Sequence, residues 1–425
     1  MSHRISASAF SSLADICGNS LTCIIFDLRG MATPGYLTLD QVIYRCPNLR
    51  KLYFRMPFFQ GEPLWSSAIP KFQHQNLVDM ALKTCNGRGI VDISPLLQLT
   101  PKLQRLYLSY GDVSARVATL PFLLHQYCPS LVSLQIRDIM DRGILPAKYS
   151  DWNLRQCTGV LEELALHDWH AEAVGLDVLH QIINVSHEHL QILELRKNDV
   201  FSEDTIAFLS AYTFLSLRRL ELSCLHGDHR GGVGSFLAHS VPNLVSLKLR
   251  AGRGLANSNL LQIEDSNMKH LEAMELSNFR LGSASSEQLI HFFDVVATSS
   301  LRTLVFCKVQ SLTVQVLESI VSKCLGVNKL VIERCDNLLI REFDAALSRW
   351  APHFHMNKLK LAFFDKDSIN YLLNHDVLRF LEIVDNIAFK WSLLTVPLVW
   401  KGLQCEPTLY GTMDYVAYNT RKSEA

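Results

Sequence analysis

The segment LQRLYL, from Leu103 to Leu108, is the clearest copy of the pattern that decides the fold of this chain. Its apolar residues follow the spacing L-x-x-L-x-L. In an extended strand the last two, Leu106 and Leu108, lie on one face, and Tyr107 between them lies on the other. The segment therefore predicts a strand with one buried face and one open face.

The same pattern recurs fourteen times when Ile, Val, Met or Phe is allowed at the apolar places. The first apolar residue of each copy is, in order, Leu21, Leu49, Leu77, Leu103, Leu131, Leu161, Leu190, Leu217, Leu244, Leu271, Leu301, Val327, Met356 and Leu378. The mean interval is about 27 residues, and leucine-rich repeats have periods of 20 to 29 residues. Fourteen copies in register indicate a repeat array.

The stretches between the copies are amphipathic, with apolar residues three and four apart, which predicts helices. Four of them cover residues 205–214, 287–296, 314–324 and 341–350, and we expect helix caps at Ser202, Ser286 and Thr313. In four copies a proline stands two residues before the first leucine: Pro47, Pro101, Pro129 and Pro242. Proline lacks an N–H group and disfavours a helical residue before it, so each one is expected at a helix-to-strand corner.

These elements predict an α/β fold, a leucine-rich repeat solenoid. Strands stack about 4.8 Å apart, whereas packed helices need about 8 to 10 Å. The array should therefore bend into a horseshoe with parallel strands on the concave face and helices on the convex face. We expect an N-terminal cap at residues 1–20, the repeats at 21–386, and a C-terminal cap with a frayed tail at 387–425.

The composition excludes several classes of protein. Apolar residues make up 48% of the chain and charged residues 19%, which excludes a disordered chain. Lys and Arg together number 41, as do Asp and Glu, so the net charge is zero and we expect neither nucleic acid nor a membrane as partner. The eleven scattered cysteines indicate reduced thiols. The N-terminus lacks the apolar core of a secretory signal, so we expect a cytoplasmic or nuclear protein.

The segments CPNLRKLYF from Cys46, CPSLVSLQI from Cys128 and CLGVNKLVI from Cys324 resemble leucine-rich repeats of the ribonuclease-inhibitor-like, cysteine-containing type. The resemblance covers residues 10–385. In that family such repeats most often form the substrate-binding half of F-box/LRR proteins, which are receptors of cullin-RING (SCF-type) ubiquitin ligases. The resemblance therefore implies a role in ubiquitin-dependent degradation, with a ligase adaptor as a partner. An F-box normally precedes the repeats, and we expect no room for one ahead of Leu21.

The open face of the strands is where a protein partner should bind. Positions three, five and seven of each copy project onto the concave face. In the first half of the array they are mostly basic with two aromatics, which suggests a patch for an acidic segment. That candidate patch consists of Lys51, Tyr53, Arg55, Lys83, Arg105, Tyr107 and Arg137. A second candidate is the loop after one strand, with His167 and Trp169. The alternative is that these charges only keep an open sheet soluble.

Two further clusters contain residue types that could carry other chemistry. Cys224, His226, Asp228 and His229 lack the paired spacing of a structural zinc site, so no metal is expected. The glycines of HRGGVGS lack the lysine of a phosphate-binding loop and predict a flexible turn between repeats. We expect no cofactor and no catalytic residues, and hence a non-enzymatic interaction module. Two functions stay open: a substrate receptor of a ubiquitin ligase, or a stand-alone scaffold or inhibitor.

Overall fold

Parallel strands alternate with helices in the computed structural model of the chain. It describes residues 7–27, 39–57, 72–85, 93–109, 120–139, 160–169, 173–196, 203–225, 232–251, 268–279, 285–296, 300–339, 342–343, 345–346, 349, 356–363, 384–392 and 412–419. The chain divides into two units. Unit 1 comprises Met1–Phe201 and Tyr212–Leu217, and unit 2 comprises Ser202–Ala211 and Arg218–Ala425.

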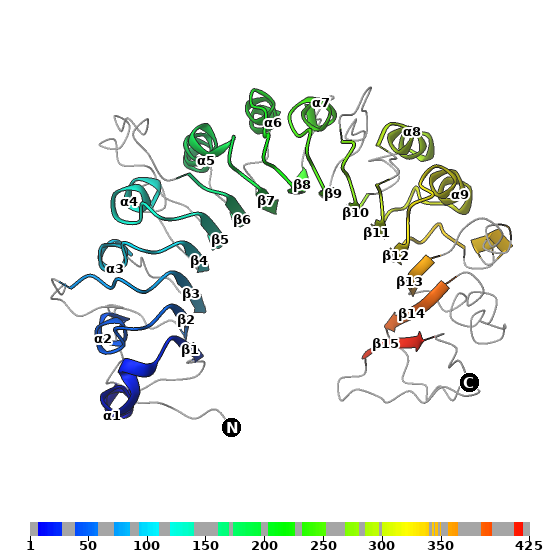
Figure 1. Cartoon of the computed structure of the whole chain (residues 1–425). Coiled ribbons are helices and arrows are strands. Elements are labelled where there is room, and N and C mark those ends of the chain that lie inside the picture. The colour runs from blue at the N-terminus through cyan, green and yellow to red at the C-terminus, as the bar shows by residue number, and fades with distance from the viewer. Residues whose placement is uncertain are drawn as a thin grey trace. The chain divides into compact units, whose positions relative to one another are not determined.

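Unit 1 contains one parallel sheet with helices on one side of it (Figure 1). Each strand pairs in parallel with the next strand in the sequence. The elements are α1 (Ala7–Cys17), the short 3-10 helix η1 (Gly18–Ser20), β1 (Cys23–Asp27), α2 (Leu39–Arg45), β2 (Lys51–Pro57), β3 (Asp79–Cys85), α3 (Ser94–Leu99), β4 (Arg105–Ser109), α4 (Leu120–Tyr127), β5 (Ser133–Ile139), β6 (Glu163–Trp169), α5 (Ala173–Ser186) and β7 (Ile192–Arg196).

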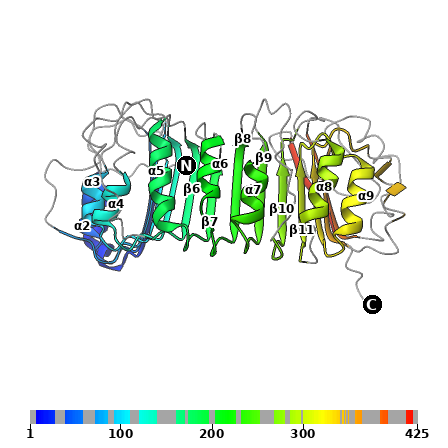
Figure 2. The same cartoon turned by 90° about the horizontal axis from the view of Figure 1, so that it is seen from above.

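Unit 2 repeats this arrangement, and Figure 2 shows its strands side by side. The elements are α6 (Glu203–Ser210), β8 (Arg219–Leu225), α7 (Gly232–His239), β9 (Ser246–Ala251), β10 (Ala273–Ser277), α8 (Ser286–Val296), β11 (Thr303–Cys307), α9 (Val314–Lys323), β12 (Lys329–Glu333), β13 (Met356–Phe363), β14 (Val384–Ser392) and β15 (Thr412–Asn419). Strands β8 to β14 are parallel, and β15 runs antiparallel to β14. The predicted α/β repeat solenoid is confirmed, with strands on one side of each unit and helices on the other.

The leucine pattern forms the core of each unit. In the copy from Leu103 the three pattern leucines are at most 1% exposed, and Leu106 pairs in register with Leu134 of the next strand. Every strand up to β12 begins two residues after the first apolar residue of its copy. Strand β13 keeps the same register, because Leu330 pairs with Leu359.

The last copy does not follow the prediction. The sequence pattern placed it at Leu378, but the strand is β14, in which Ile387 pairs with Leu359 and Phe389 with Leu361. The first apolar position of this copy is therefore Val384. The expected boundary between residues 386 and 387 falls inside β14. Residues 420–425, the expected frayed tail, lie outside the described residues.

The helix-to-strand corners form as the prolines predicted. Pro47, Pro101, Pro129 and Pro242 each lie in the turn after a helix. In the first of these turns the Leu49 N–H donates to the Cys46 carbonyl over 3.0 Å. Cys46, Cys128 and Cys324 share this place in their copies and are at most 1% exposed. Burial raises the pKa of Cys128 to about 12 and that of Cys324 to about 11, so these thiols act as small core groups.

The predicted helices form with small shifts at their ends. The Thr313 hydroxyl caps α9 by accepting from the Val316 N–H at 3.3 Å, as expected. The cap of α8 is Ser285 rather than Ser286, since Ser285 Oγ accepts from the Gln288 N–H and Gln288 Oε1 accepts from the Ser285 N–H. Ser202 lies outside the described residues.

Three further predictions from the sequence concern two helices and the glycine-rich segment HRGGVGS. Helix α6 is shorter than the predicted stretch 205–214 and ends at Ser210. Of the predicted helix 341–350, residues 342–343, 345–346 and 349 are described and are helical. Two glycines of HRGGVGS, Gly232 and Gly234, lie inside α7, so the predicted flexible turn is wrong there.

Three successive strands of unit 2 end in the same turn. Asn278, Lys308 and Arg334 follow β10, β11 and β12 and have φ values of 64°, 57° and 55°. This left-handed conformation turns the chain back toward the core, and the next residue in each copy is buried. Those residues are Phe279, Val309 and Cys335. The leucine-rich repeat pattern has Asn or Cys at this ninth position of a copy; Cys335 fits it, whereas Phe279 and Val309 put a buried apolar side chain there.

The segment before the first strand packs tightly against α2. Gly18 lies where an added Cβ would come within 2.3 Å of the Arg45 carbonyl oxygen. The substitution Gly18→Ala should therefore force η1 away from α2 and lower the free energy of unfolding by about 1 to 3 kcal/mol, the usual effect of overpacking. Urea unfolding and hydrogen exchange of the β1 amides measure this loss. The exposed neighbour Ser20→Ala is the control, and equal stability of the two variants would contradict the close contact.

Candidate functional site

The strand face of unit 1 is the surface formed by positions three, five and seven of β1 to β7. Sheet register aligns these positions into three rows that cross the strands. The first row is Cys23, Lys51, Asp79, Arg105, Ser133, Glu163 and Ile192. The middle row is Ile25, Tyr53, Ala81, Tyr107, Gln135, Ala165 and Glu194. The last row is Asp27, Arg55, Lys83, Ser109, Arg137, His167 and Arg196.

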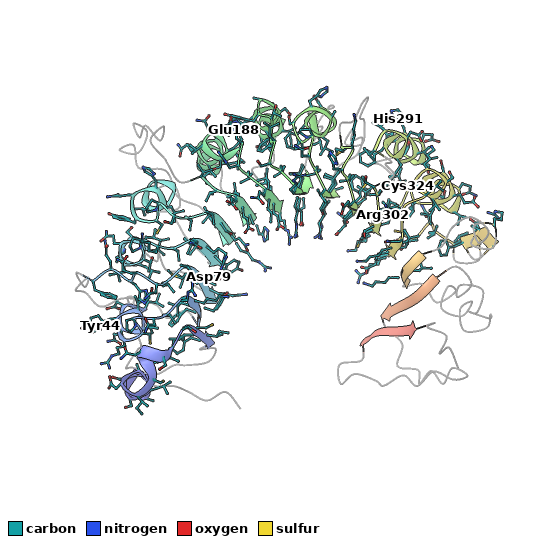
Figure 3. The ribbon with its side chains drawn as sticks, viewed as in Figure 1. Tyr44, Asp79, Glu188, His291, Arg302 and Cys324 are labelled. Carbon is teal, nitrogen blue, oxygen red and sulfur yellow. The ribbon has the colours of Figure 1, made fainter. Side chains whose placement is uncertain are left out.

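Asp79 organises the first of two polar clusters on this face and lies on the strand side of the unit (Figure 3). Its Oδ2 accepts from Arg105 Nε at 3.2 Å and from the Tyr53 hydroxyl at 3.3 Å. The Asp79 side chain is 14% exposed and that of Arg105 is 49% exposed. Burial and the Asp79 carboxylate raise the pKa of Tyr53, so its hydroxyl stays a donor at neutral pH. Asp79 thus links three adjacent strands and offsets the charge of Arg105.

Glu194 organises the second cluster, at the other end of the sheet. Its Oε2 contacts His167 Nε2 at 3.1 Å and Arg196 Nη2 at 2.9 Å, and its side chain is 11% exposed. Nearby, Ser133 Oγ donates to Glu163 Oε2 at 2.7 Å. Each of the acids Asp79, Glu163 and Glu194 is therefore engaged by neighbours on the same face.

The last row is predominantly basic. It holds three arginines and one lysine, against a single acid at its β1 end. Arg55 and Lys83 are register partners on neighbouring strands, and Arg137 pairs in register with His167. Arg137 is exposed, and Lys83 is half-buried. The positive charge of the strand face is therefore concentrated in this row.

The structure places the predicted binding residues as follows. The first-half residues all lie in the three rows, and Asp79 brings Tyr53 and Arg105 together. The side chains of Arg55 and Trp169 lie outside the described part of the chain. The expected loop at His167 and Trp169 is wrong, because both residues belong to β6, in which Trp169 pairs with Ile139.

Sequence reasoning missed the roles of Asp79 and Glu194. Asp79 stands at position three of its copy, as Arg105 does in the next copy. Two opposite charges at one position of consecutive copies must face each other in a parallel sheet in register. That signal was present for Asp79. For Glu194 the sequence signal was weaker, because Glu194 stands at position five of its copy whereas its partners, His167 and Arg196, stand at position seven.

Unit 2 carries charge pairs on its own strand side. Lys248 Nζ lies 3.1 Å from Glu275 Oε2, and Lys360 pairs with Glu333.

Among the residues described, no group of three or more His, Cys, Asp or Glu side chains could hold a metal ion. Cys224 belongs to β8, and His226, Asp228 and His229 lie outside the described ranges. No described helix has both the length and the hydropathy that crossing a bilayer requires.

Comparison with known proteins gave matches only among solved structures. No protein-family model matches the chain, and no curated protein matches it. The chain is similar to a structure of the yeast Rad7 and Elc1 complex, with 15% identity, 87% of this chain and 80% of that chain covered, and a TM-score of 0.45. It is also similar to the functional domain of InlJ from Listeria monocytogenes, which includes a cysteine ladder. That match has 12% identity, covers 82% of this chain and 70% of that chain, and has a TM-score of 0.30.

Proposed function

We propose that this chain is a non-enzymatic protein-binding module whose strand face in unit 1 captures an acidic segment of a partner protein. The observation that carries the proposal is the last row, in which Arg55, Lys83, Arg137 and Arg196 stand at one register position of the sheet. The partner segment lies across the strands along this row, and Tyr53 and Tyr107 of the middle row lie beside it.

Electrostatics support an acidic occupant. Arg55 and Lys83 occupy adjacent strands, which are about 4.8 Å apart, and like charges at paired positions destabilise a sheet. A carboxylate placed between them relieves this repulsion. The acids Asp79 and Glu194 already engage Arg105, His167 and Arg196. At the Arg55 and Lys83 end of the last row the one acid is Asp27, which is the register partner of Arg55, so an added negative charge is most favourable on the Lys83 side.

Charge reversal tests the proposal. A photo-crosslinking amino acid replaces Tyr107, and the chain is expressed in its own cell with or without Lys83→Glu and Arg137→Glu. The reversed variant is expected to lose at least tenfold of the crosslinked partner, because two attractive contacts become repulsive. The matched control reverses two exposed cations outside the rows, Arg50→Glu and Lys102→Glu, and should keep full crosslinking. Equal crosslinking by both double variants would exclude the last row as the binding site.

The finer proposal is that the captured partner is delivered to a cullin-RING ubiquitin ligase. It is supported by the resemblance of the cysteine-containing repeats to those of F-box/LRR proteins. A stand-alone scaffold or inhibitor, which holds its partner without a ligase complex, is the second candidate. Affinity purification of the native protein under mild conditions separates the two. A stoichiometric cullin adaptor supports the receptor, and a captured partner without any adaptor or cullin supports the scaffold.

A further inference from the structure

The strand side of unit 2 carries an excess of positive charge over β9 to β12. The surface in question is formed by positions three, five, seven and eight of these four copies. Two acids lie on it and both are engaged, since Glu275 pairs with Lys248 and Glu333 pairs with Lys360 of the next strand. The other charged residues of the surface are all cations: Arg250, Lys308, Lys329 and Arg334. Among the described residues, no acid pairs with Arg250, Lys308 or Lys329.

Left-handed turns place two of these cations where the strands end. Lys308 and Arg334 follow β11 and β12 with φ values of 57° and 55°, and both side chains are exposed. This conformation is unfavourable for Lys and Arg, whereas Asn, which follows β10 as Asn278, tolerates it. Burial and the Glu333 carboxylate raise the pKa of the Cys307 thiol at position seven of β11. Lys308 and Arg334 act on that pKa in the opposite direction, so both cations lie beside the strand face.

Small uncharged side chains form the floor between the cations. Ala273, Thr303 and Val305 are half-buried and stand at positions three and five of β10 and β11, which pair in register. On β12, Lys329 stands at position three and Arg334 at position eight, which places them roughly 16 Å apart along the chain. A helix with its side chains is about 10 to 12 Å wide, so one peptide segment fits between the two cations.

The floor favours a peptide over a nucleic acid. Proteins that bind single-stranded nucleic acid without sequence preference stack the bases on aromatic side chains. None of the described side chains at these positions of β9 to β12 is aromatic. Val305 and Ala273 instead offer an apolar contact for an aliphatic side chain of a partner.

We infer that this surface of unit 2 binds an acidic peptide segment that carries aliphatic side chains between its carboxylates. The carboxylates on one flank bind Arg250 and Lys308 at the strand ends, and those on the other flank bind Lys329. An aliphatic side chain of the segment packs on Val305. The surface belongs to other strands than the last row of unit 1, and the inference does not depend on the function proposed for that row.

A short synthetic peptide of glutamate and valine residues is the probe, and the same peptide with glutamine for glutamate is its neutral counterpart. Binding to the full chain is followed by the NMR methyl signals of Val305. We expect the acidic peptide to shift these signals saturably and the neutral peptide to bind at least tenfold more weakly. The double variant Arg250→Glu with Lys308→Glu should lose at least tenfold in affinity for the acidic peptide, because two attractive contacts become repulsive. Arg250→Lys with Lys308→Arg keeps both charges and should bind within about twofold of the unsubstituted chain.

Two matched charge reversals locate the binding. Lys102→Glu with Lys269→Glu reverses two exposed cations outside the surface and should leave the affinity unchanged. Lys83→Glu with Arg137→Glu in unit 1 should also leave the Val305 shifts unchanged, so failure of this inference and failure of the proposed function are told apart.

A single-stranded oligothymidylate tests the other class of anion. It should shift the Val305 signals at least tenfold more weakly than the acidic peptide, and equal or tighter binding would overturn the choice of a peptide. Val305 signals that do not respond to the acidic peptide, or an equal loss of affinity in the Arg250/Lys308 and Lys102/Lys269 reversals, would overturn the inference.

Discussion

Leu247→Asp is expected to unfold unit 2 around β9, with a loss of more than about 4 kcal/mol in the free energy of unfolding. Leu247 is 0% exposed and lies in register with Leu220 on β8 and Met274 on β10. A carboxylate at this place is buried without a partner, which is among the most destabilising single changes. A repeat completes its core only with its neighbours, so the damage should spread to β8 and β10. Circular dichroism during urea unfolding and hydrogen exchange of the β8 to β10 amides measure it.

Glu221→Lys is the matched control for this prediction. Glu221 is half-buried and stands at position five of β8, next to the buried Leu220. A change of two charge units on the strand side should cost less than about 1 kcal/mol, because charge pairs at such sites contribute little. Comparable unfolding by Glu221→Lys and Leu247→Asp would show that the inside and outside assignment of the strands is wrong.

His74→Ala is expected to cost about 4 kcal/mol, the second largest effect. His74 is 0% exposed, and its Nδ1 accepts from the N–H groups of Asn76 and Leu77 at 3.3 and 3.0 Å. Its Nε2 donates to the Cys46 carbonyl at 2.9 Å. Alanine would leave the buried N–H of Leu77 without an acceptor, would remove one of the two donors to the Cys46 carbonyl and would add a cavity. Thermal and urea unfolding of unit 1 measure the loss.

His74 stands where other copies carry cysteine, three residues before the first leucine. In the copy of Cys46 the backbone carbonyl accepts from the first leucine, whereas here the imidazole accepts from Leu77. His74→Cys and His74→Ala both lose the imidazole hydrogen bonds and both allow the backbone turn of the other copies, but the thiol fills more of the vacated volume, so His74→Cys should cost less. Equal losses in the two variants would show that filling this volume contributes little.

The same residue makes stability depend on pH in a defined direction. Burial lowers the pKa of His74 below its ordinary value of 6.5, so the folded protein keeps the imidazole neutral where the unfolded chain binds a proton. The contribution of His74 should be complete above pH 6.5 and should fall as the pH drops toward the folded pKa. The difference in unfolding free energy between the original chain and His74→Ala, measured at pH 7.5 and 5.5, tests this. An equal difference at the two pH values would contradict a buried imidazole that stays neutral in the folded protein.

The repeat pattern predicted the strand positions because each copy carries the whole pattern within a few consecutive residues. The last copy shows where prediction from such a local pattern fails. Residues 378–383 and 384–389 both satisfy the pattern, LRFLEI in the first frame and VDNIAF in the second. Local spacing cannot choose between them. The choice is made by pairing with β13, in which Leu359 is the register partner of Ile387, a residue distant from it in the sequence.

For the residues of the candidate patch, the face of the strand was predictable from the sequence but the pairing of the side chains was not. Position numbering placed Tyr53, Lys83 and Arg105 opposite the pattern leucines, and in the structure they lie at those register positions and are half-buried or exposed. That Asp79 holds both Tyr53 and Arg105 depends on side-chain rotamers and on alignment across strands.

The antiparallel strand β15 has a consequence for how such an array can change in length. Two neighbouring parallel strands need a crossover connection. Because β15 runs opposite to β14, the strand of a module that follows β15 through the same kind of crossover cannot continue the parallel pairing. A duplicated module would fit where parallel strands flank it on both sides, for example between β9 and β10. Gene duplication or protein engineering should therefore extend this array by internal insertion rather than by appending modules after β15.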